Sequence, residues 1–434
     1  MIDWLSEVLA VDETISGIID DGLTRSISTL DVTSPASFRA VLIAVLANQT
    51  ERPLLAVTST YREAEQLTAE LVALLGESEV AYYPAWEVLP HERLSPRAEV
   101  VGRRLAVLRR IAGHNGQPPK VVVGPVRSIL QPQSVGLADI VPVELKVGAD
   151  YDLNQLASDL VNAAYARVDL VERRGEFAVR GGIVDIFPPT QPHPVRIDFF
   201  GDTIEDIRYF SVADQRSTDE TLNTVIAPPC RELILTEKVR DRAKKLASQH
   251  PQLAEILEKI AQGQPTEGME SLIPVLVDGL ELLVDVLPED ALVLVCDPEL
   301  VATRSDELVK TSQEFLQASW GVAAAGGEVP IDLGASAYRS LAQVRKHVLQ
   351  RGQAWWTLSP FTLEVTDEEI DSQTETEPEL ADLNISGVTS RQLAVSVSPY
   401  LAGDAEGVIA GIARAKQAGN SVLIAVEGRG LGHR

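Results

Sequence analysis

Short apolar segments alternate with longer amphipathic segments over residues 24–130 of this chain. Residues 53–57 (PLLAV) and 120–124 (KVVVG) have the length and apolar content of buried strands, and residues 61–75 carry apolar side chains at helical spacing. Strands that alternate with helices in this way form a parallel sheet with helices packed on its faces. The sequence therefore predicts an α/β fold.

A different pattern interrupts this alternation from about residue 142. A helix is expected at 152–163, and short β-rich pieces follow, such as 176–180. After a charged helical stretch at 237–261, an isolated apolar strand at 291–295 restores the α/β pattern. We expect one α/β domain that is interrupted by a small α+β insert. The expected divisions are 1–141 and 216–363 for the two parts of the α/β domain, 142–215 for the insert, 364–390 for a linker and 391–434 for the beginning of a partial small α/β domain.

The expected linker is strongly acidic. Between residues 352 and 390 there is no Lys or Arg, while nine Asp and Glu residues accumulate with few apolar ones. This composition favours a solvated linker, with a binding tail as the alternative. Beyond it, a helix is expected at 405–417 and a strand at 421–426. Because the chain stops shortly after that strand, we expect it to be a piece of a longer protein.

The charge balance restricts the partners that the chain can bind directly. There are 38 Lys and Arg residues against 63 Asp and Glu residues, which gives a net charge of −25. Sequence-independent affinity for DNA comes from basic side chains that neutralise phosphates. We therefore expect this surface to repel DNA.

The sequence also predicts the compartment and the absence of metal. It contains no run of about 18 apolar residues, and its first twenty residues are acidic where a signal peptide begins with positive charge. Cys230 and Cys296 lie far apart without CxxC spacing, and the six histidines show no HxxxH or HExxH spacing. We expect a cytoplasmic protein with no membrane association and no metal site.

A turn between an expected strand and an expected helix occupies the place of a phosphate-binding loop. Such a loop needs G-x-x-x-x-G-K-[ST], because glycines expose backbone N–H groups to phosphate, Lys contacts the β and γ oxygens, and the hydroxyl holds Mg²⁺. Asp31 adds a carboxylate near the expected phosphates, Ser37 replaces the cation and Phe38 removes the metal ligand. We therefore expect neither ATP nor Mg²⁺ to bind, although an ordinary strand-to-helix turn is also compatible with these residues. The eight positions are Asp31, Val32, Thr33, Ser34, Pro35, Ala36, Ser37 and Phe38.

A second degenerate motif follows the strand at 291–295. Its end is compatible with the acidic D-E-x-H box that organises metal and water in nucleotide-driven motors. Asp297 is present, but Pro298 stands in the place of the Glu and is followed by Glu299. A plain strand-to-turn junction explains the same residues equally well.

Longer stretches give the chain a family resemblance. Residues 82–90 (YYPAWEVLP), 94–97 (LSPR) and 103–108 resemble the transcription-repair coupling factors (Mfd), and residues 173–188 (RRGEFAVRGGIVDIFP) resemble the insert domain that this family shares with UvrB. The strand and helix over 52–75 are laid out as in the helicase-type motor of UvrB. The resemblance implies a degenerate helicase-like domain without catalysis, interrupted by an insert that contacts UvrA.

The resemblance also implies partners outside this segment. Later domains of the family bind stalled RNA polymerase, move on DNA with an ATP-driven motor, and hide the UvrA-contacting face until activation. The segment is thus expected to recruit UvrA in nucleotide excision repair, with RNA polymerase, DNA, ATP and Mg²⁺ bound by regions beyond residue 434. One alternative is an ATP-dependent damage-verifying enzyme like UvrB, although the chain is too short for the DNA-threading hairpin of UvrB. The other alternative is a structural brace for a translocase.

Arginines are concentrated in the expected insert, where four fall within 14 positions. Arginine is favoured at interfaces because its guanidinium pairs with carboxylates through two hydrogen bonds. Together with the resemblance, this cluster predicts a UvrA contact centred on Arg167 and Arg180. A solvated strand face with salt bridges to neighbours such as Asp185 is the alternative, with the nearby phenylalanines in the core. The expected contact residues are Arg167, Arg173, Arg174, Phe177, Arg180 and Phe187.

Overall fold

The computed structural model describes residues 2–90, 92–114, 116–324, 337–361, 389–395, 404–420 and 422. The chain divides into one compact unit over Met1–Leu393 and a second over Ala394–Arg434. The second unit contains helix α15 (Ala405–Gln417), which confirms the helix expected there. The strand expected at 421–426 lies outside the described residues.

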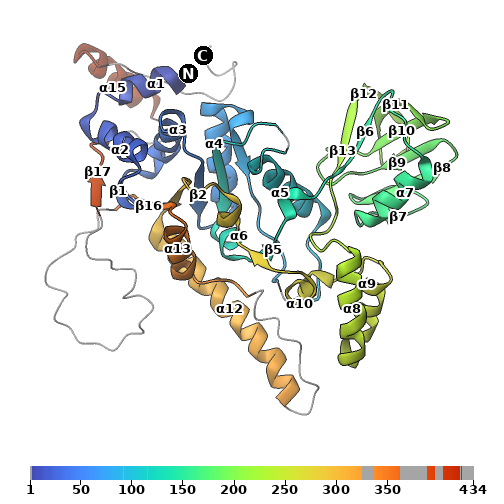
Figure 1. The fold of residues 1–434 in the computed structure, drawn as a ribbon. Helices are drawn as coiled ribbons and strands as arrows, with labels where there is room; N and C mark the ends of the chain where they lie inside the picture. Colours follow the sequence, from blue (N-terminus) through green and yellow to red (C-terminus); the bar gives the residue numbers. More distant parts are fainter. Residues whose placement is uncertain are drawn as a thin grey trace. The chain divides into compact units, whose positions relative to one another are not determined.

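Seven strands of the described residues form one parallel sheet in the first unit (Figure 1). The order across the sheet is β17-β1-β16-β15-β2-β4-β3, and every neighbouring pair is parallel. Strands β2, β4 and β15 are buried along their whole length, as expected where helices cover both faces. The predicted α/β fold is confirmed. The strands are β1 (Thr29–Thr33), β2 (Leu54–Thr58), β3 (Val80–Tyr82), β4 (Val121–Pro125), β15 (Leu292–Cys296), β16 (Ala354–Ser359) and β17 (Thr389–Gln392).

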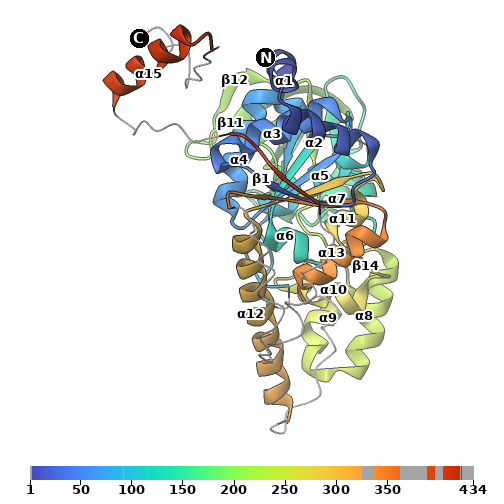
Figure 2. The same cartoon turned by 90° about the vertical axis from the view of Figure 1, so that its left-hand side faces the viewer.

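Helices pack against this sheet (Figure 2). Side chains from α5, α6, α11, α12 and α13 share one continuous core with β2, β4, β15 and β16. Helices α1, α2 and α4 each pack against α3. No helix in the described part of the chain is long and apolar enough to cross a membrane. The helices are α1 (Ile2–Leu9), α2 (Glu13–Thr24), α3 (Arg39–Gln49), α4 (Tyr61–Leu75), α5 (Ala98–Ile111), α6 (Val126–Leu130), α11 (Leu283–Val286), α12 (Pro298–Ala324) and α13 (Leu341–Gln350).

An α+β insert follows the first half of the sheet, as predicted. Its six-stranded sheet has the order β12-β11-β10-β9-β8-β7, in which only the β7–β8 pair is parallel. Helix α7 (Leu153–Asn162) covers one face of this sheet, and Leu156 and Leu160 enter the core. The strands are β7 (Ala166–Arg167), β8 (Glu176–Arg180), β9 (Ile183–Ile186), β10 (Val195–Phe200), β11 (Thr203–Phe210) and β12 (Ser217–Thr221).

The insert extends past the boundary expected at residue 215. Strand β13 (Thr224–Ala227) pairs antiparallel with β6 (Val143–Lys146), so the chain enters and leaves the insert side by side. Before β13, the five residues of β12 are all exposed. They lack the apolar alternation that identifies a half-buried strand, which explains why the sequence did not reveal this extension.

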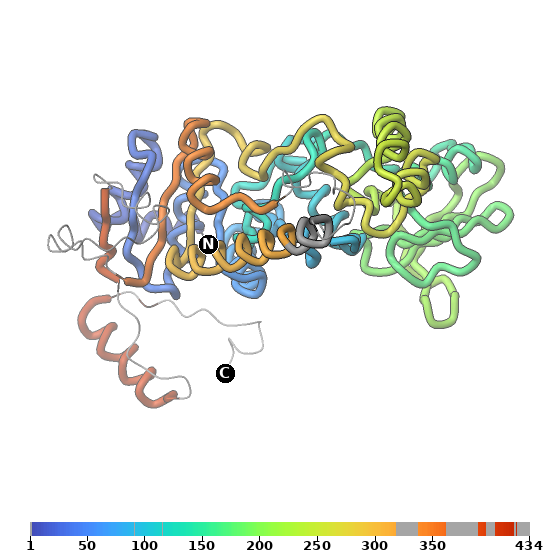
Figure 3. Tube along the Cα trace, turned by 90° about the horizontal axis from the view of Figure 1, so that it is seen from below, coloured from blue at the N-terminus to red at the C-terminus, as the bar shows by residue number. Residues whose placement is uncertain are grey.

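A helical segment follows the insert and lies beside it (Figures 1 and 3). The stretch expected at 237–261 is two helices, α8 (Glu237–Gln249) and α9 (Ala254–Ala261). Pro251 explains the break, because proline lacks the backbone N–H and disfavours helical geometry in the residue before it. The two helices share a core with the 3₁₀ helix η5 (Met269–Leu272) and with α10 (Ile273–Leu276).

The edge strand β17 was not expected from the sequence. It pairs with β1, the Arg391 guanidinium contacts the Asp21 carboxylate of α2 at 3.1 Å, and the Leu393 N–H donates to the Thr33 carbonyl at 3.0 Å. Residues 391–393, assigned from the sequence to the next domain, therefore belong to the main sheet. Most of the expected acidic linker, residues 364–388, lies outside the described residues.

Candidate partner surface and degenerate nucleotide loop

The turn between β1 and α3 is shorter than a phosphate-binding loop. Strand β1 continues to Thr33, and the 3₁₀ helix η1 (Ala36–Phe38) begins after only Ser34 and Pro35. Asp31, which was expected to project near the phosphates, lies inside the strand, where its carboxylate accepts a hydrogen bond from the Thr357 hydroxyl at 2.6 Å. The sheet register thus places this carboxylate away from the turn.

Two of the backbone donors of this turn are already in use. The N–H of Ser34 donates to the Ser359 carbonyl at 2.9 Å, and the N–H of Phe38 donates to the Pro35 carbonyl at 2.9 Å. Pro35 itself has no N–H. A phosphate cradle needs several free N–H groups that converge on one point. This turn offers no such set at Ser34, Pro35 and Phe38.

An ion pair joins Arg39, the residue after the first degenerate motif, to Asp297 of the second. The guanidinium of Arg39, at the start of α3, lies 2.6 Å from the carboxylate of Asp297, and the two side chains are only 13% and 15% exposed. Asp297 has a positive φ of 52°, and its N–H donates to the Leu358 carbonyl at 2.9 Å. Parallel strands place their carboxyl ends at one edge of the sheet, which brings these motifs together.

The other residues of the acidic motif also have structural roles. Pro298 begins α12, where a missing N–H costs nothing, and Glu299 accepts from the Ser359 hydroxyl at 3.4 Å. Burial raises the pKa of the neighbouring Cys296 thiol to about 12. Among the described residues, no group of three or more His, Cys, Asp or Glu side chains is placed to hold a metal ion.

The structure divides the predicted contact residues of the insert between surface and core. Phe177 is fully buried in the core beneath α7, and Phe187 is 7% exposed in a small cluster on the other face of the sheet. Neither phenylalanine presents its ring to a partner in this structure, which corrects their prediction as contact residues. The alternation of strand residues explains Phe177, because it points to the face of β8 that α7 covers while its neighbours point to the opposite face.

The arginines predicted as contact residues differ in whether their guanidinium groups already contact other residues of this chain. Arg174 stacks on Phe187 at 4.7 Å and donates to the Gln191 carbonyl at 3.0 Å. Arg180 is 49% exposed and lies 3.0 Å from the buried Asp185 carboxylate. Arg167 and Arg173 are exposed, and within the described chain their guanidinium groups make no ion pair or hydrogen bond. These two are the arginines most available to a partner.

Arg167 and Arg180 lie on opposite faces of the insert sheet. Arg167 is in parallel register with Phe177, whose ring enters the core beneath α7. Arg180 is three residues further along β8, so its side chain points to the other face. A partner that contacts both arginines must therefore reach around the β7 edge of the sheet.

Comparison with known proteins agrees with this geometry. Residues 143–231 match the family described as the UvrB interaction domain. The chain is 48% identical over 353 residues to the transcription-repair-coupling factors of Mycobacterium bovis and Mycobacterium tuberculosis, a match that covers 77% of this chain and 28% of each relative. It is 35% identical over 313 residues to that of Myxococcus xanthus, covering 67% of this chain and 25% of the relative.

This chain matches the N-terminal portion of the transcription-repair-coupling factors. It contains their UvrB interaction domain and spans roughly a quarter of the length of these relatives. The resemblance indicated by the sequence motifs is confirmed. The matched interval begins with β6 and ends just past β13, in agreement with the extent of the insert in the structure.

The motif that carried the resemblance to transcription-repair-coupling factors has a structural role that the sequence did not reveal. Arg104 of α5 is fully buried, and its guanidinium lies 2.6 Å from Glu232, just after the insert. The Trp86 indole donates to the same carboxylate at 2.9 Å, and the guanidinium stacks on Tyr83 at 4.4 Å. Gln133 accepts from Arg104 at 3.1 Å. This network fixes the end of the insert to the main domain.

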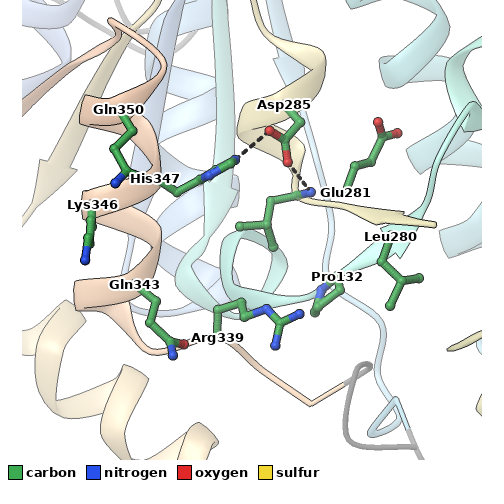
Figure 4. Close-up of a pocket in the computed structure, with 10 residues that line it drawn as sticks. Pro132, Leu280, Glu281, Asp285, Arg339, Gln343, Lys346, His347 and Gln350 are labelled. Atoms are coloured by element: carbon green, nitrogen blue, oxygen red, sulfur yellow. Dashed lines mark hydrogen bonds and ion pairs between the residues drawn. The ribbon is translucent and has the colours of Figure 1, made fainter.

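A surface pocket of about 400 Å³ is lined by Pro132 and by side chains from α11 and α13 (Figure 4). Across it, His347 of α13 contacts Asp285 at 2.6 Å, and the Leu282 N–H donates to the same carboxylate at 2.7 Å. Arg339 and Lys346 also line the pocket. None of the residues predicted from the sequence as partner or nucleotide contacts lines it.

Proposed function

We propose that this chain is a non-catalytic module that recruits UvrA, and that it serves a protein linking stalled RNA polymerase to nucleotide excision repair. The observation that carries the proposal is the match of residues 143–231 to the UvrB interaction domain, on a sheet with exposed arginines. UvrA is the partner that the family resemblance implies. Arg167 and Arg173 supply cations that are not occupied by carboxylates of the described chain.

We also propose that this chain neither binds nor hydrolyses ATP. The support for this proposal is the two-residue turn after β1, together with the ion pair between Arg39 and Asp297 at the carboxyl edge of the sheet. An arginine that is held by a carboxylate cannot also neutralise phosphate without losing that contact. We expect contacts with RNA polymerase, DNA, ATP and Mg²⁺ to be made by other parts of a longer cytoplasmic protein, which also cover the UvrA surface until activation.

The direct test measures binding of purified UvrA by biolayer interferometry. Arg167→Glu with Arg173→Glu should weaken binding at least tenfold, about 1.4 kcal/mol, since each reversal places like charges across the contact. The melting temperature should remain within a few degrees of the unaltered chain. Arg62→Glu, an exposed arginine on α4, is the matched control and should leave binding unchanged.

Two outcomes would support rival functions. Lack of UvrA binding by the unaltered chain would favour a structural brace. Micromolar binding of a fluorescent ATP analogue, lost on substitution around Ser37, would favour an ATP-dependent enzyme. The variant Arg180→Glu is a poor test because it places a second carboxylate beside Asp185, which is 1% exposed, and this disturbs the sheet itself.

A further inference from the structure

The pocket drawn in Figure 4 lies in the main α/β domain, outside the insert. One wall is strand β14 (Leu280–Glu281) with the turn into α11, and the opposite wall is helix α13 together with Arg339 before it. Its volume of about 400 Å³ is within the range of ligand-binding sites. The pocket has no role in the function proposed above, so its ligand is inferred from the chemistry of its walls.

Strand β14 has one hydrogen-bonded neighbour among the described residues. It pairs antiparallel with β5 (Gln133–Ser134), and Leu280 lies opposite Ser134. The Val135 N–H donates to the Gly279 carbonyl at 3.1 Å, so the pair next to Leu280 is a hydrogen-bonded one. Hydrogen-bonded and non-hydrogen-bonded pairs alternate along an antiparallel ladder. The N–H and C=O of Leu280 therefore point away from β5.

The open edge of β14 faces the pocket. Leu282, two residues after Leu280, has its backbone directed to the same side, and its N–H donates to the Asp285 carboxylate at 2.7 Å. That carboxylate also contacts His347 of α13 at 2.6 Å, across the pocket (Figure 4). Leu280 thus directs one backbone donor and one backbone acceptor toward α13, and no strand of the described chain pairs with them. An extended segment in this position would continue the ladder of β5 and β14.

Hydrogen bonds and ion pairs hold the walls of the pocket. Besides its contact with His347, the Asp285 carboxylate lies 3.4 Å from the Arg351 guanidinium. The Arg339 N–H donates to the Leu130 carbonyl of α6 at 2.9 Å. These contacts connect α6, α11 and α13, so both walls are fixed before a ligand arrives. A preformed site loses little conformational entropy on binding, which favours affinity.

The charges that line the pocket favour an anionic group. The Asp285 carboxylate is compensated by the contacts just described, and burial raises the pKa of Glu281, which disfavours its charged form. Lys346 is exposed, and within the described chain its ammonium group makes no ion pair or hydrogen bond. Arg339 adds a second cation to the lining. The pocket therefore combines an open strand edge with an available positive charge at Lys346.

We propose that this pocket binds an extended acidic peptide segment of another protein. The segment adds a strand to β14 through the N–H and C=O of Leu280, and one of its carboxylates contacts the ammonium group of Lys346. Main-chain hydrogen bonds supply affinity in this mode of recognition, and the side chains that meet the pocket supply selectivity. The site is separate from the arginines of the insert, so it can hold a second partner in addition to the one proposed for the insert.

The experiment measures binding of a fluorescein-labelled peptide of alternating valine and glutamate by fluorescence anisotropy. Lys346→Glu should weaken binding about tenfold or more, because it places like charges across the contact. Lys310→Glu, which reverses an exposed lysine on α12, is the matched control. It should bind within about twofold of the unaltered chain, because salt screens charges outside the contact. Both variants have the same net charge, so the general repulsion of an acidic peptide is equal in the two.

Strand addition is tested separately from charge. A peptide with methylated backbone nitrogens cannot donate to the Leu280 carbonyl and should bind about tenfold more weakly or worse. Leu280→Pro removes the N–H that faces the pocket, while the hydrogen bonds to β5 are made by the neighbouring residues. It should cause a similar loss of binding. The melting temperature of this variant shows whether the strand persists, and the methylated peptide tests the same contact without any change to the protein.

Four results would overturn the proposal. The first is equal binding of the acidic peptide and of its counterpart with lysine in place of glutamate. The second is binding of the acidic peptide that Lys346→Glu and backbone methylation both leave unchanged. Displacement of the peptide by free glutamate at the same concentration as by unlabelled peptide would show a pocket for small anions instead of strand addition. Absence of any binding by the acidic peptide would overturn the site as a whole.

Discussion

The ion pair between Arg39 and Asp297 connects the first turn of α3 with the end of β15. Both side chains are mostly buried, so neither charge is well solvated without the other. Removal of one partner from a buried pair costs several kcal/mol, whereas replacement of both by apolar groups of similar volume is often close to neutral. The pair therefore has a measurable role in stability that does not depend on any ligand.

Arg39→Ala is expected to lower the free energy of unfolding by about 3 kcal/mol, because the Asp297 carboxylate is left buried and unpaired. Arg39→Met combined with Asp297→Asn should recover most of this loss, because asparagine carries no charge and tolerates the positive φ of this position. Urea unfolding followed by tryptophan fluorescence measures both variants. Equal losses for the single and the double variant would contradict the role assigned to the pair.

Individual residues show what could and could not be predicted from the sequence at this scale. It predicted that Ser37 and Phe38 lack the chemistry of a phosphate site, since that judgement needs only the identity of the side chains. It could not place Asp31 in the strand, because the end of β1 depends on pairing with β16, more than 300 positions later in the chain. The ion pair of Arg180 with Asp185, in contrast, agrees with the alternative interpretation of the arginine cluster, which expected salt bridges to such neighbours.

The insert contacts the main domain closely at the level of helices and loops. On α5, a Cβ at Gly102 would lie 2.4 Å from Cβ of Pro189 in the insert. Glu99, one turn earlier, lies 4.0 Å from the Arg174 guanidinium. The helix can approach the insert this closely only because Gly102 has no side chain.

Gly102→Ala is expected to destabilise the chain by about 1 to 3 kcal/mol, since neither the helix nor the proline ring can yield easily. Gly17→Ala is the matched control. Gly17 lies inside α2 with no atom within 4 Å of an added Cβ, so alanine should stabilise the chain by roughly 0.5 to 1 kcal/mol. Thermal unfolding should show opposite shifts for the two variants, and shifts of the same sign would refute this account.

Elements with strong local signals were predictable. Helix α4 begins at the expected residue because the Thr60 hydroxyl accepts from the Glu63 N–H at 3.3 Å and the Glu63 carboxylate accepts from the Thr60 N–H at 3.2 Å. Strand β17 (TSRQ) carries no apolar alternation and exists through its pairing with β1 and the contact of Arg391 with Asp21. Such a strand depends on tertiary contacts that composition does not encode.

At the scale of the whole molecule, the net charge of −25 opposes association with another polyanion. The Kd for duplex DNA should therefore be above about 10 μM at physiological salt, in the weaker half of the range for non-specific binding. Fluorescence anisotropy with damaged and undamaged duplexes provides the measurement. Submicromolar affinity that prefers the lesion would contradict the expectation.

The division of the chain was predictable only in outline. The alternation of strands and helices revealed that an insert interrupts an α/β domain, because each part has its own periodicity. Its end was misplaced at residue 215, since the pairing of β13 with β6 joins segments that are far apart in sequence. A domain boundary that is set by strand pairing between distant segments has no clear signal in the local sequence.

The order of strands in the main sheet has a consequence for biosynthesis. Strands β15 and β16 lie between β1 and β2, yet the ribosome makes them more than 200 residues later. Until residue 359 has left the ribosome, β1 and β2 each keep an unpaired apolar edge, which invites aggregation. The insert, whose strands pair with near neighbours in the chain, can fold during this interval. The nascent chain is therefore most dependent on chaperones while its smaller domain is already complete.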